Sequence, residues 1–165
     1  MPSLPLHLLP DTATVDDRGS LSIGGIAVSE LAATHGTPLF VYDETHLRRR
    51  CREAVDAFGH QQAVYATKAF LCRAMARRAY EEGMLLDVAS GGELAVALSA
   101  GVPAHRLVLH GNNKSDDELR RARDVGVGRI VVDSFDELDR LERLHEHDAL
   151  VPKVLLRLTP GVEAH

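Results

Sequence analysis

The feature that most constrains the fold is a repeat of apolar, strand-like runs in the later part of the chain. The runs start about 21 to 24 residues apart, and a helix-length segment fills each gap. They are continuous rather than alternating, which is typical of strands in a parallel sheet covered by helices. The runs are 63–66, 85–88, 107–109, 130–132 and 154–158. This pattern predicts an α/β domain built from successive βα units.

The starts of three predicted helices carry the same short motif. Each matches S-x-x-E, in which the serine oxygen accepts a free N–H of the first helical turn and the glutamate reaches back. The three motifs begin at Ser90, Ser115 and Ser134, a few residues after an apolar run. One match is weak, but three at this spacing indicate strand–turn–helix units.

A sequential run of βα units forms either an open doubly wound sheet or a barrel. No G-x-G-x-x-G follows any predicted strand, so a dinucleotide-binding sheet has no support. We expect a partial TIM-type barrel of about five of the eight βα units. The chain ends directly after the fifth run, and we expect it to be the front part of a longer protein.

The first sixty residues show a different pattern. A strand with a Gly-Gly turn, a short helix, a second strand and a longer helix opened by Asp43 are predicted there. The ranges are 21–28, 29–35, 39–42 and 44–58.

Composition excludes several classes of function. The net charge is −5 and basic residues are scattered, which argues against nucleic-acid binding. No stretch approaches the ~18 apolar residues of a membrane span, and Cys51 and Cys72 form no CxxC pair. No metal is expected, because His145 and His147 lack a third ligand. A cytoplasmic protein fits these observations.

Polar residues gather at the predicted carboxyl ends of the strands, where barrels carry their function. Such groups are costly at the ends of buried strands unless they are paired or used. They are Lys68, Asp87, His110, Asn112, Asn113, Asp133, Ser134, Arg157 and Thr159.

Lys68 is the most informative member of this set. A lysine amine in such a place can attack a carbonyl and form a Schiff base. The alternative is structural: Lys68 pairs with Asp87 or extends its amine into solvent. Position alone favours the structural alternative.

A family resemblance shifts that balance. "YATKAF" resembles the Y-A-x-K-A-N motif of fold-type III pyridoxal-phosphate enzymes, with Phe70 at the usual asparagine. "LDVASGGELAVAL", "LHGNNKS", "IVVDSFDELDRL" and "LLRLTPGVEAH" are similar to successive blocks of the diaminopimelate decarboxylases. The resemblance runs from about Pro38 to the last residue.

The resemblance implies a site that binds pyridoxal 5'-phosphate. Lys68 would form the Schiff base with the cofactor, and Asp87 would keep the lysine charged between steps. Ala66 would pack near the cofactor ring, and Arg157 would pair with Asp87. His110 would shape the pocket, although a structural hydrogen bond to Asn112 or to the backbone is the favoured alternative.

The resemblance also implies the reaction and the organisation of the protein. The longer protein of which this chain would be the front part, called the parent below, would convert the amino acid meso-diaminopimelate to L-lysine and CO2 as a homodimer. Residues 1–37 would belong to the family's β-domain and residues 38–165 to the barrel, so this chain alone would be inactive. The rivals are a decarboxylase of another basic amino acid, an alanine racemase, a non-catalytic cofactor-binding barrel and a non-functional product.

Overall fold

The computed structural model describes residues 5–145 and 152–161. The chain divides into two compact units, Met1–Ala54 and Val55–His165. The expected division after residue 37 is not tested by these two units and stays a prediction.

The first unit holds a small antiparallel sheet with strand order β1-β2-β3. Gly24 and Gly25 both have positive φ and form the turn between β2 and β3, so the predicted strand over 21–28 is a hairpin. The 3-10 helix η1 precedes the sheet and helix α1 follows it. The bounds are η1 Leu6–Leu8, β1 Thr14–Val15, β2 Leu21–Ile23, β3 Ile26–Ala27 and α1 Val28–His35.

Helix α2, Glu44–Phe58, begins at the predicted residue. Asp43 caps it, because its Oδ1 accepts the backbone N–H of His46 at 2.7 Å. The other carboxylate oxygen accepts the hydroxyl of Thr12, and these bonds lower the pKa of the Asp43 carboxyl. The cap therefore ties the start of α2 to the loop that precedes β1.

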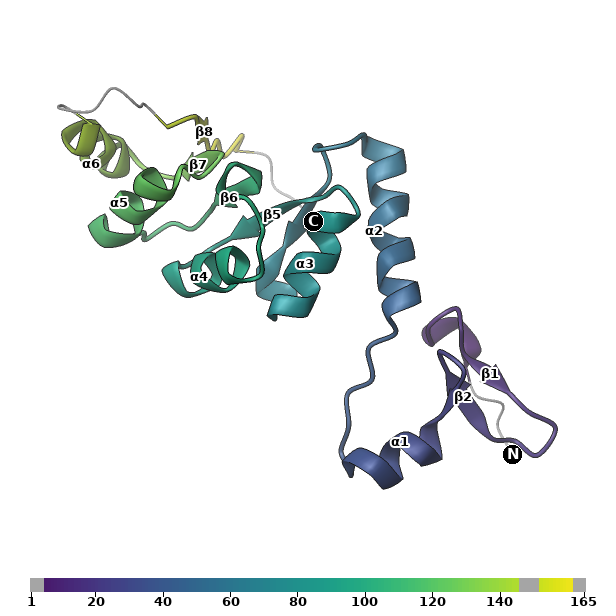
Figure 1. The fold of residues 1–165 in the computed structure, drawn as a ribbon. Coiled ribbons are helices and arrows are strands. Elements are labelled where there is room, and N and C mark those ends of the chain that lie inside the picture. Colours follow the sequence, from purple (N-terminus) through teal and green to yellow (C-terminus); the bar gives the residue numbers. More distant parts are fainter. Residues whose placement is uncertain (1–4, 146–151, 162–165) are drawn as a thin grey trace. The chain divides into compact units, whose positions relative to one another are not determined.

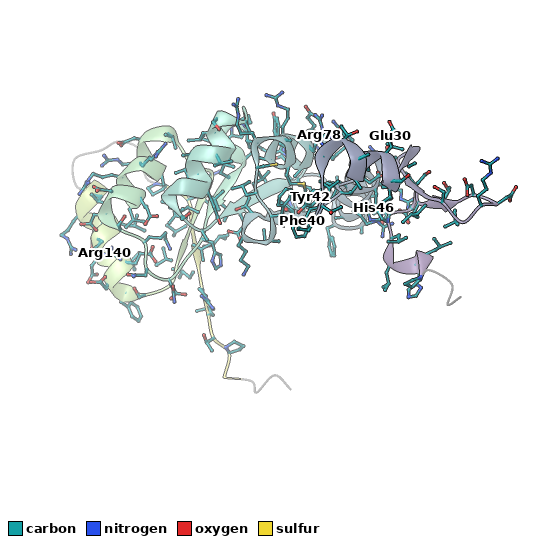
Figure 2. All side chains as sticks on the ribbon, turned by 90° about the horizontal axis from the view of Figure 1, so that it is seen from below. Glu30, Phe40, Tyr42, His46, Arg78 and Arg140 are labelled. Carbon is teal, nitrogen blue, oxygen red and sulfur yellow. The ribbon has the colours of Figure 1, made fainter. Side chains whose placement is uncertain are left out.

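The predicted strand over 39–42 is wrong. These residues form neither helix nor strand, and Phe40 and Tyr42, both marked in Figure 2, are exposed. An apolar segment becomes a strand only where another strand accepts its backbone hydrogen bonds. Neither described sheet pairs with this segment.

The second unit is an alternation of strands and helices along the chain. All five predicted strands are present, and their observed bounds differ from the predicted ones by at most a few residues. The bounds are β4 Val64–Ala66, η2 Thr67–Ala69, α3 Arg73–Glu81, β5 Leu85–Val88, α4 Gly91–Ser99, η3 Ala104–Arg106, β6 Leu107–Leu109, α5 Asp116–Val125, β7 Arg129–Val132, α6 Phe135–His145 and β8 Val154–Leu156.

The sheet of the second unit has the order expected for a barrel. Its strands are parallel and neighbour one another in the order β4-β5-β6-β7-β8. In a doubly wound sheet, by contrast, the order in which successive strands are added reverses at a switch point. Helices α3 to α6 follow one another along one side of the strands (Figure 1). The unit is a partial α/β barrel, as predicted.

The two faces of this sheet differ in burial. The face under the helices is an apolar core whose side chains are at most 4% exposed; these residues are Leu86, Val88, Leu107, Leu109, Ile130 and Val132. The alternate residues point to the other face, where Leu85, Val108 and Val131 form a smaller cluster. Val64 and Leu155, on the outer strands, are 45% exposed. The second face therefore forms an open, partly apolar hollow.

Candidate active site

The candidate site lies at the carboxyl ends of the parallel strands. Lys68 is in the 3-10 turn η2 directly after β4, Asp87 is near the end of β5, and His110 and Arg157 follow β6 and β8. Ala66 is the last residue of β4. The topology thus brings the predicted site residues to one edge of one sheet.

The turn that carries Lys68 is held from both sides. The hydroxyl of Tyr65 donates to the carbonyl oxygen of Phe70 at 2.6 Å. The hydroxyl of Thr67, which is 1% exposed, lies 2.8 Å from the carbonyl oxygen of Asp87 and 2.9 Å from Oε2 of Glu93. Lys68 is consequently an exposed side chain on a fixed backbone.

The amine of Lys68 makes no hydrogen bond and no ion pair within 4.0 Å to the residues that the structure describes. The structural Lys68–Asp87 pair, one of the alternatives open from sequence, is therefore absent from this part of the chain. Asp87 is still close enough for its carboxylate to interact with the lysine charge. A primary amine that is free to react and is fixed at its backbone suits attachment to a carbonyl.

Asp87 is a carboxylate in an unfavourable environment. Its Oδ1 is buried and has no hydrogen-bond partner among the described residues. Burial raises the pKa of the Asp87 carboxyl and Glu93 adds to this effect, while His110 and Lys68 act against it. A carboxyl group of this kind, which lines a hollow and interacts with a nearby lysine, is a candidate for holding or passing a proton.

Asp87, His110 and Arg157 line one hollow on the open face of the sheet, with a volume of about 550 Å³. Apolar side chains of the strands, including Val108 and Val131, form its floor. Volume and lining are of the kind that accepts a small molecule. Ala66 and Lys68 are not among its lining residues.

The expected pairing of Arg157 with Asp87 is not found. Its Nη1 lies 2.9 Å from Oδ1 of Asp133, not beside Asp87. In the sheet, β8 is separated from β5 by β6 and β7. Asp133 follows the adjacent strand β7 and is the nearer carboxylate.

The ring of His110 makes neither of the expected side-chain hydrogen bonds within the described part of the chain. Only its backbone N–H is bound, to the carbonyl oxygen of Val88 at 2.8 Å. The ring therefore contributes to the lining of the hollow.

The three S-x-x-E glutamates do more than the motif predicts. Each serine accepts the N–H of its glutamate, as expected, but each carboxylate also reaches the preceding βα unit. Glu93 receives the Thr67 hydroxyl, and Glu118 receives the N–H of Gly91 at 2.7 Å.

Glu137 makes the third of these links. Its Oε1 lies 2.6 Å from Nζ of Lys114, and both side chains are almost fully buried. Arg140 of α6, marked in Figure 2, adds a bond to the carbonyl oxygen of Lys114 at 2.7 Å. The sequence gives no signal for these links, because they depend on which strand lies next to which.

Two classes of site find no support in the described ranges. Residues 5–145 and 152–161 contain no cluster of three or more His, Cys, Asp or Glu that could hold a metal ion. His147 and the side chain of His145 lie outside the described residues. None of the helices in those ranges is long and apolar enough to cross a bilayer.

Comparison with known proteins adds independent findings. Residues 44–165 match the family described as "Pyridoxal-dependent decarboxylase, pyridoxal binding domain". The chain is 53% identical to the diaminopimelate decarboxylase of Mycobacterium tuberculosis over 97% of its length, and 48% identical to that of Bacillus subtilis over 95%. It spans about 37% of the length of these curated relatives.

Solved structures give the same result. The fold is similar to the diaminopimelate decarboxylase of M. jannaschii, with a TM-score of 0.86 and 31% identity. That match covers 94% of this chain and 38% of the solved one. A structure of the same enzyme in complex with L-lysine matches with a TM-score of 0.82 over 93% of this chain and 37% of the solved one, at 31% identity.

Proposed function

This chain belongs to the pyridoxal-dependent decarboxylases, and we propose that it supplies the lysine-bearing part of the cofactor site in a diaminopimelate decarboxylase. One observation carries the proposal. Lys68 follows the first parallel strand with a free amine, and the buried, unpartnered carboxylate oxygen of Asp87 is near it. The amino-acid substrate is inferred from the relatives, one of which is solved with L-lysine.

The residues present fit pyridoxal 5'-phosphate. Lys68 offers the primary amine that an aldehyde requires, and the hollow lined by Asp87 is large enough for a small molecule. When bound, the cofactor withdraws electrons from the substrate carbon that loses CO2. The protein's task is to place the scissile bond and to manage protons.

We assign each predicted residue a separate task. Lys68 binds the cofactor covalently, and Asp87 stabilises the positive charge of the Lys68 amine when that amine is released. Ala66 leaves room for a flat ring because its side chain is small. His110 lines the hollow, and Arg157 is oriented by Asp133 rather than by Asp87. A homodimer and a cytoplasmic location belong to the same proposal.

The test is to map where pyridoxal phosphate attaches. The chain is incubated with the cofactor and reduced with borohydride, and its peptides are analysed by mass spectrometry. Lys68, Lys114 and Lys153 are its lysines, so the two others serve as internal controls. The adduct is expected on Lys68 and lost in Lys68→Ala. An equal adduct on exposed Lys153 would contradict the proposal.

The substrate is tested by offering the longer protein several amino acids. Formation of L-lysine from meso-diaminopimelate should far exceed decarboxylation of ornithine or arginine and racemisation of alanine. A preference for one of these would move the parent to another branch of the family. The 165-residue chain alone is expected to form no lysine.

A further inference from the structure

A second hollow lies at the other end of the parallel strands from Lys68. Its volume is about 460 Å³, within the range of small-molecule sites. Arg129 is the first residue of β7 and Lys153 immediately precedes β8, which places the hollow at the amino ends of the strands. Its lining includes Gln61, Gln62, Arg123, Arg129 and Lys153.

The lining of this hollow has one sign of charge. Arg123, Arg129 and Lys153 contribute cations, and no carboxylate is among the described lining residues. Arg123 is accounted for, because Asp124 and the carbonyl oxygen of Leu144 bind its guanidinium. The side chains of Arg129 and Lys153 have no hydrogen-bond or ion-pair partner within the described ranges. Two cations of this wall are thus left without a counter-charge.

These two cations lie at the starts of neighbouring strands. β7 and β8 are paired from Ile130 beside Val154 onward, and Arg129 and Lys153 are the residues that immediately precede this first pair. The N–H of Ile130 donates to the carbonyl oxygen of Lys153 at 2.9 Å. Like charges on neighbouring strands repel each other. A bound anion would convert this repulsion into two attractions.

We propose that this hollow binds a small dianion, a dicarboxylate or a phosphate, between Arg129 and Lys153. The guanidinium of Arg129 offers the flat fork that matches carboxylate and phosphate oxygens, and the ammonium of Lys153 adds a compact charge. Gln61 and Gln62 bring side-chain amides to the same wall. The hollow adjoins the one that Asp87 lines, and Arg129 belongs to both, whereas Lys153 belongs only to this one. Because Lys153 lies at the amino ends of the strands, away from Lys68, the bound anion is an effector rather than a substrate.

The experiment measures binding by isothermal titration calorimetry with the 165-residue chain in about 0.15 M NaCl, where bulk charge effects are screened. Inorganic phosphate and succinate are titrated separately, and the anion that binds more tightly shows whether the site prefers a phosphate or a dicarboxylate. Lys153→Gln and Arg129→Gln are compared with the unaltered chain. Arg121→Gln is the matched control, because Arg121 is an exposed arginine of α5 outside the lining.

Saturable one-to-one binding is expected, and each lining variant should weaken it roughly ten- to hundredfold, the loss of one charge-assisted bond. The control should bind as the unaltered chain does. Lys153 is exposed, so its variant keeps the fold, which a thermal melt by circular dichroism verifies. Unchanged affinity in Lys153→Gln, or no saturable binding of either anion, overturns the proposal.

Discussion

The buried pair of Lys114 and Glu137 allows the sharpest prediction about stability. The two charged atoms lie 2.6 Å apart, and the side chains are 1% and 2% exposed. Glu137→Gln keeps the shape and an acceptor for the N–H of Asp133, but leaves the ammonium of Lys114 with two carbonyl oxygens, those of Gly111 and Val131, as its acceptors. The amide NH2 then faces that ammonium, so the substitution removes a counter-charge and sets two donors against each other.

Breaking a buried pair in this way costs about 3–5 kcal/mol of unfolding free energy, because the remaining charge stays buried without compensation. For a unit of this size that corresponds to a fall of roughly 10–20 °C in Tm. Urea unfolding followed by circular dichroism measures the free energy, with an unchanged slope showing that the folded and unfolded states are comparable.

A double-mutant cycle tests the reasoning itself. Lys114→Met and Glu137→Gln together should cost less than the sum of the single variants by about 2–3 kcal/mol. Asp117→Asn is the control, since it breaks the exposed pair with Arg120 and should cost at most about 1 kcal/mol. A cost below about 1 kcal/mol for Glu137→Gln, or additivity within about 0.5 kcal/mol, would refute the argument.

Three further predictions follow from the site and the caps. Thr67→Val keeps the shape of the side chain but removes the hydroxyl that lies between Glu93 and the carbonyl oxygen of Asp87. It should lower the unfolding free energy by about 1.5–3 kcal/mol, measured by urea unfolding, and slow cofactor attachment to Lys68, measured by adduct yield. No change in either quantity would contradict the conclusion that this hydroxyl holds the Lys68 turn in place. The lowered pKa values of Asp43 and Glu118, caused first by the bond from Thr12 and by the N–H of Ser115 respectively, stabilise the fold above the unfolded-state pKa of about 4. This contribution disappears as pH falls through the folded-state values. In thermal melts between pH 7 and 2, the Tm of the unaltered chain should fall more steeply with decreasing pH than the Tm of Asp43→Asn. The effect of Asp87 on stability has the opposite sign, because its raised pKa means that the charged form opposes folding at neutral pH. Asp87→Asn should therefore raise Tm at pH 7 and have less effect on Tm below pH 4. A lower Tm of this variant at pH 7 would count against the argument.

The sequence predicts the framework of the second unit well because its signals are local. Continuous apolar runs mark strands that are buried under helices, and the serine caps act within four residues. The position of Lys68 at the end of a strand also follows from the local pattern. Its role, like those of Ala66, Asp87, His110 and Arg157, stays a prediction.

The failures concern contacts between segments far apart in the chain. The pairing of Arg157 with Asp133 depends on strand order, which a run of apolar residues does not specify. The segment 39–42 has strand-like residues but no strand beside it. Thr67 and Glu93 read as an ordinary strand-end residue and an ordinary cap, because only the three-dimensional register brings them together.

The glutamates that link each helix start to the preceding unit determine where this chain can accept added residues. The strand-to-helix turns at that edge are tied on two sides, so one residue inserted between Asp133 and Ser134 would pull Glu137 away from Lys114. On the opposite edge, Gly101 is exposed, and the turn around it is tied to the preceding helix α3 only by the bond from Nε of Arg77 to the carbonyl oxygen of Ala100, at 3.3 Å, among the described residues. The turn before β5 is less free, because the buried guanidinium of Arg106 donates to the carbonyl oxygens of Gly83 and Met84. A tag, a probe or a circular-permutation breakpoint therefore belongs at the turn of Gly101, and the length of the strand-to-helix turns is fixed by their neighbours.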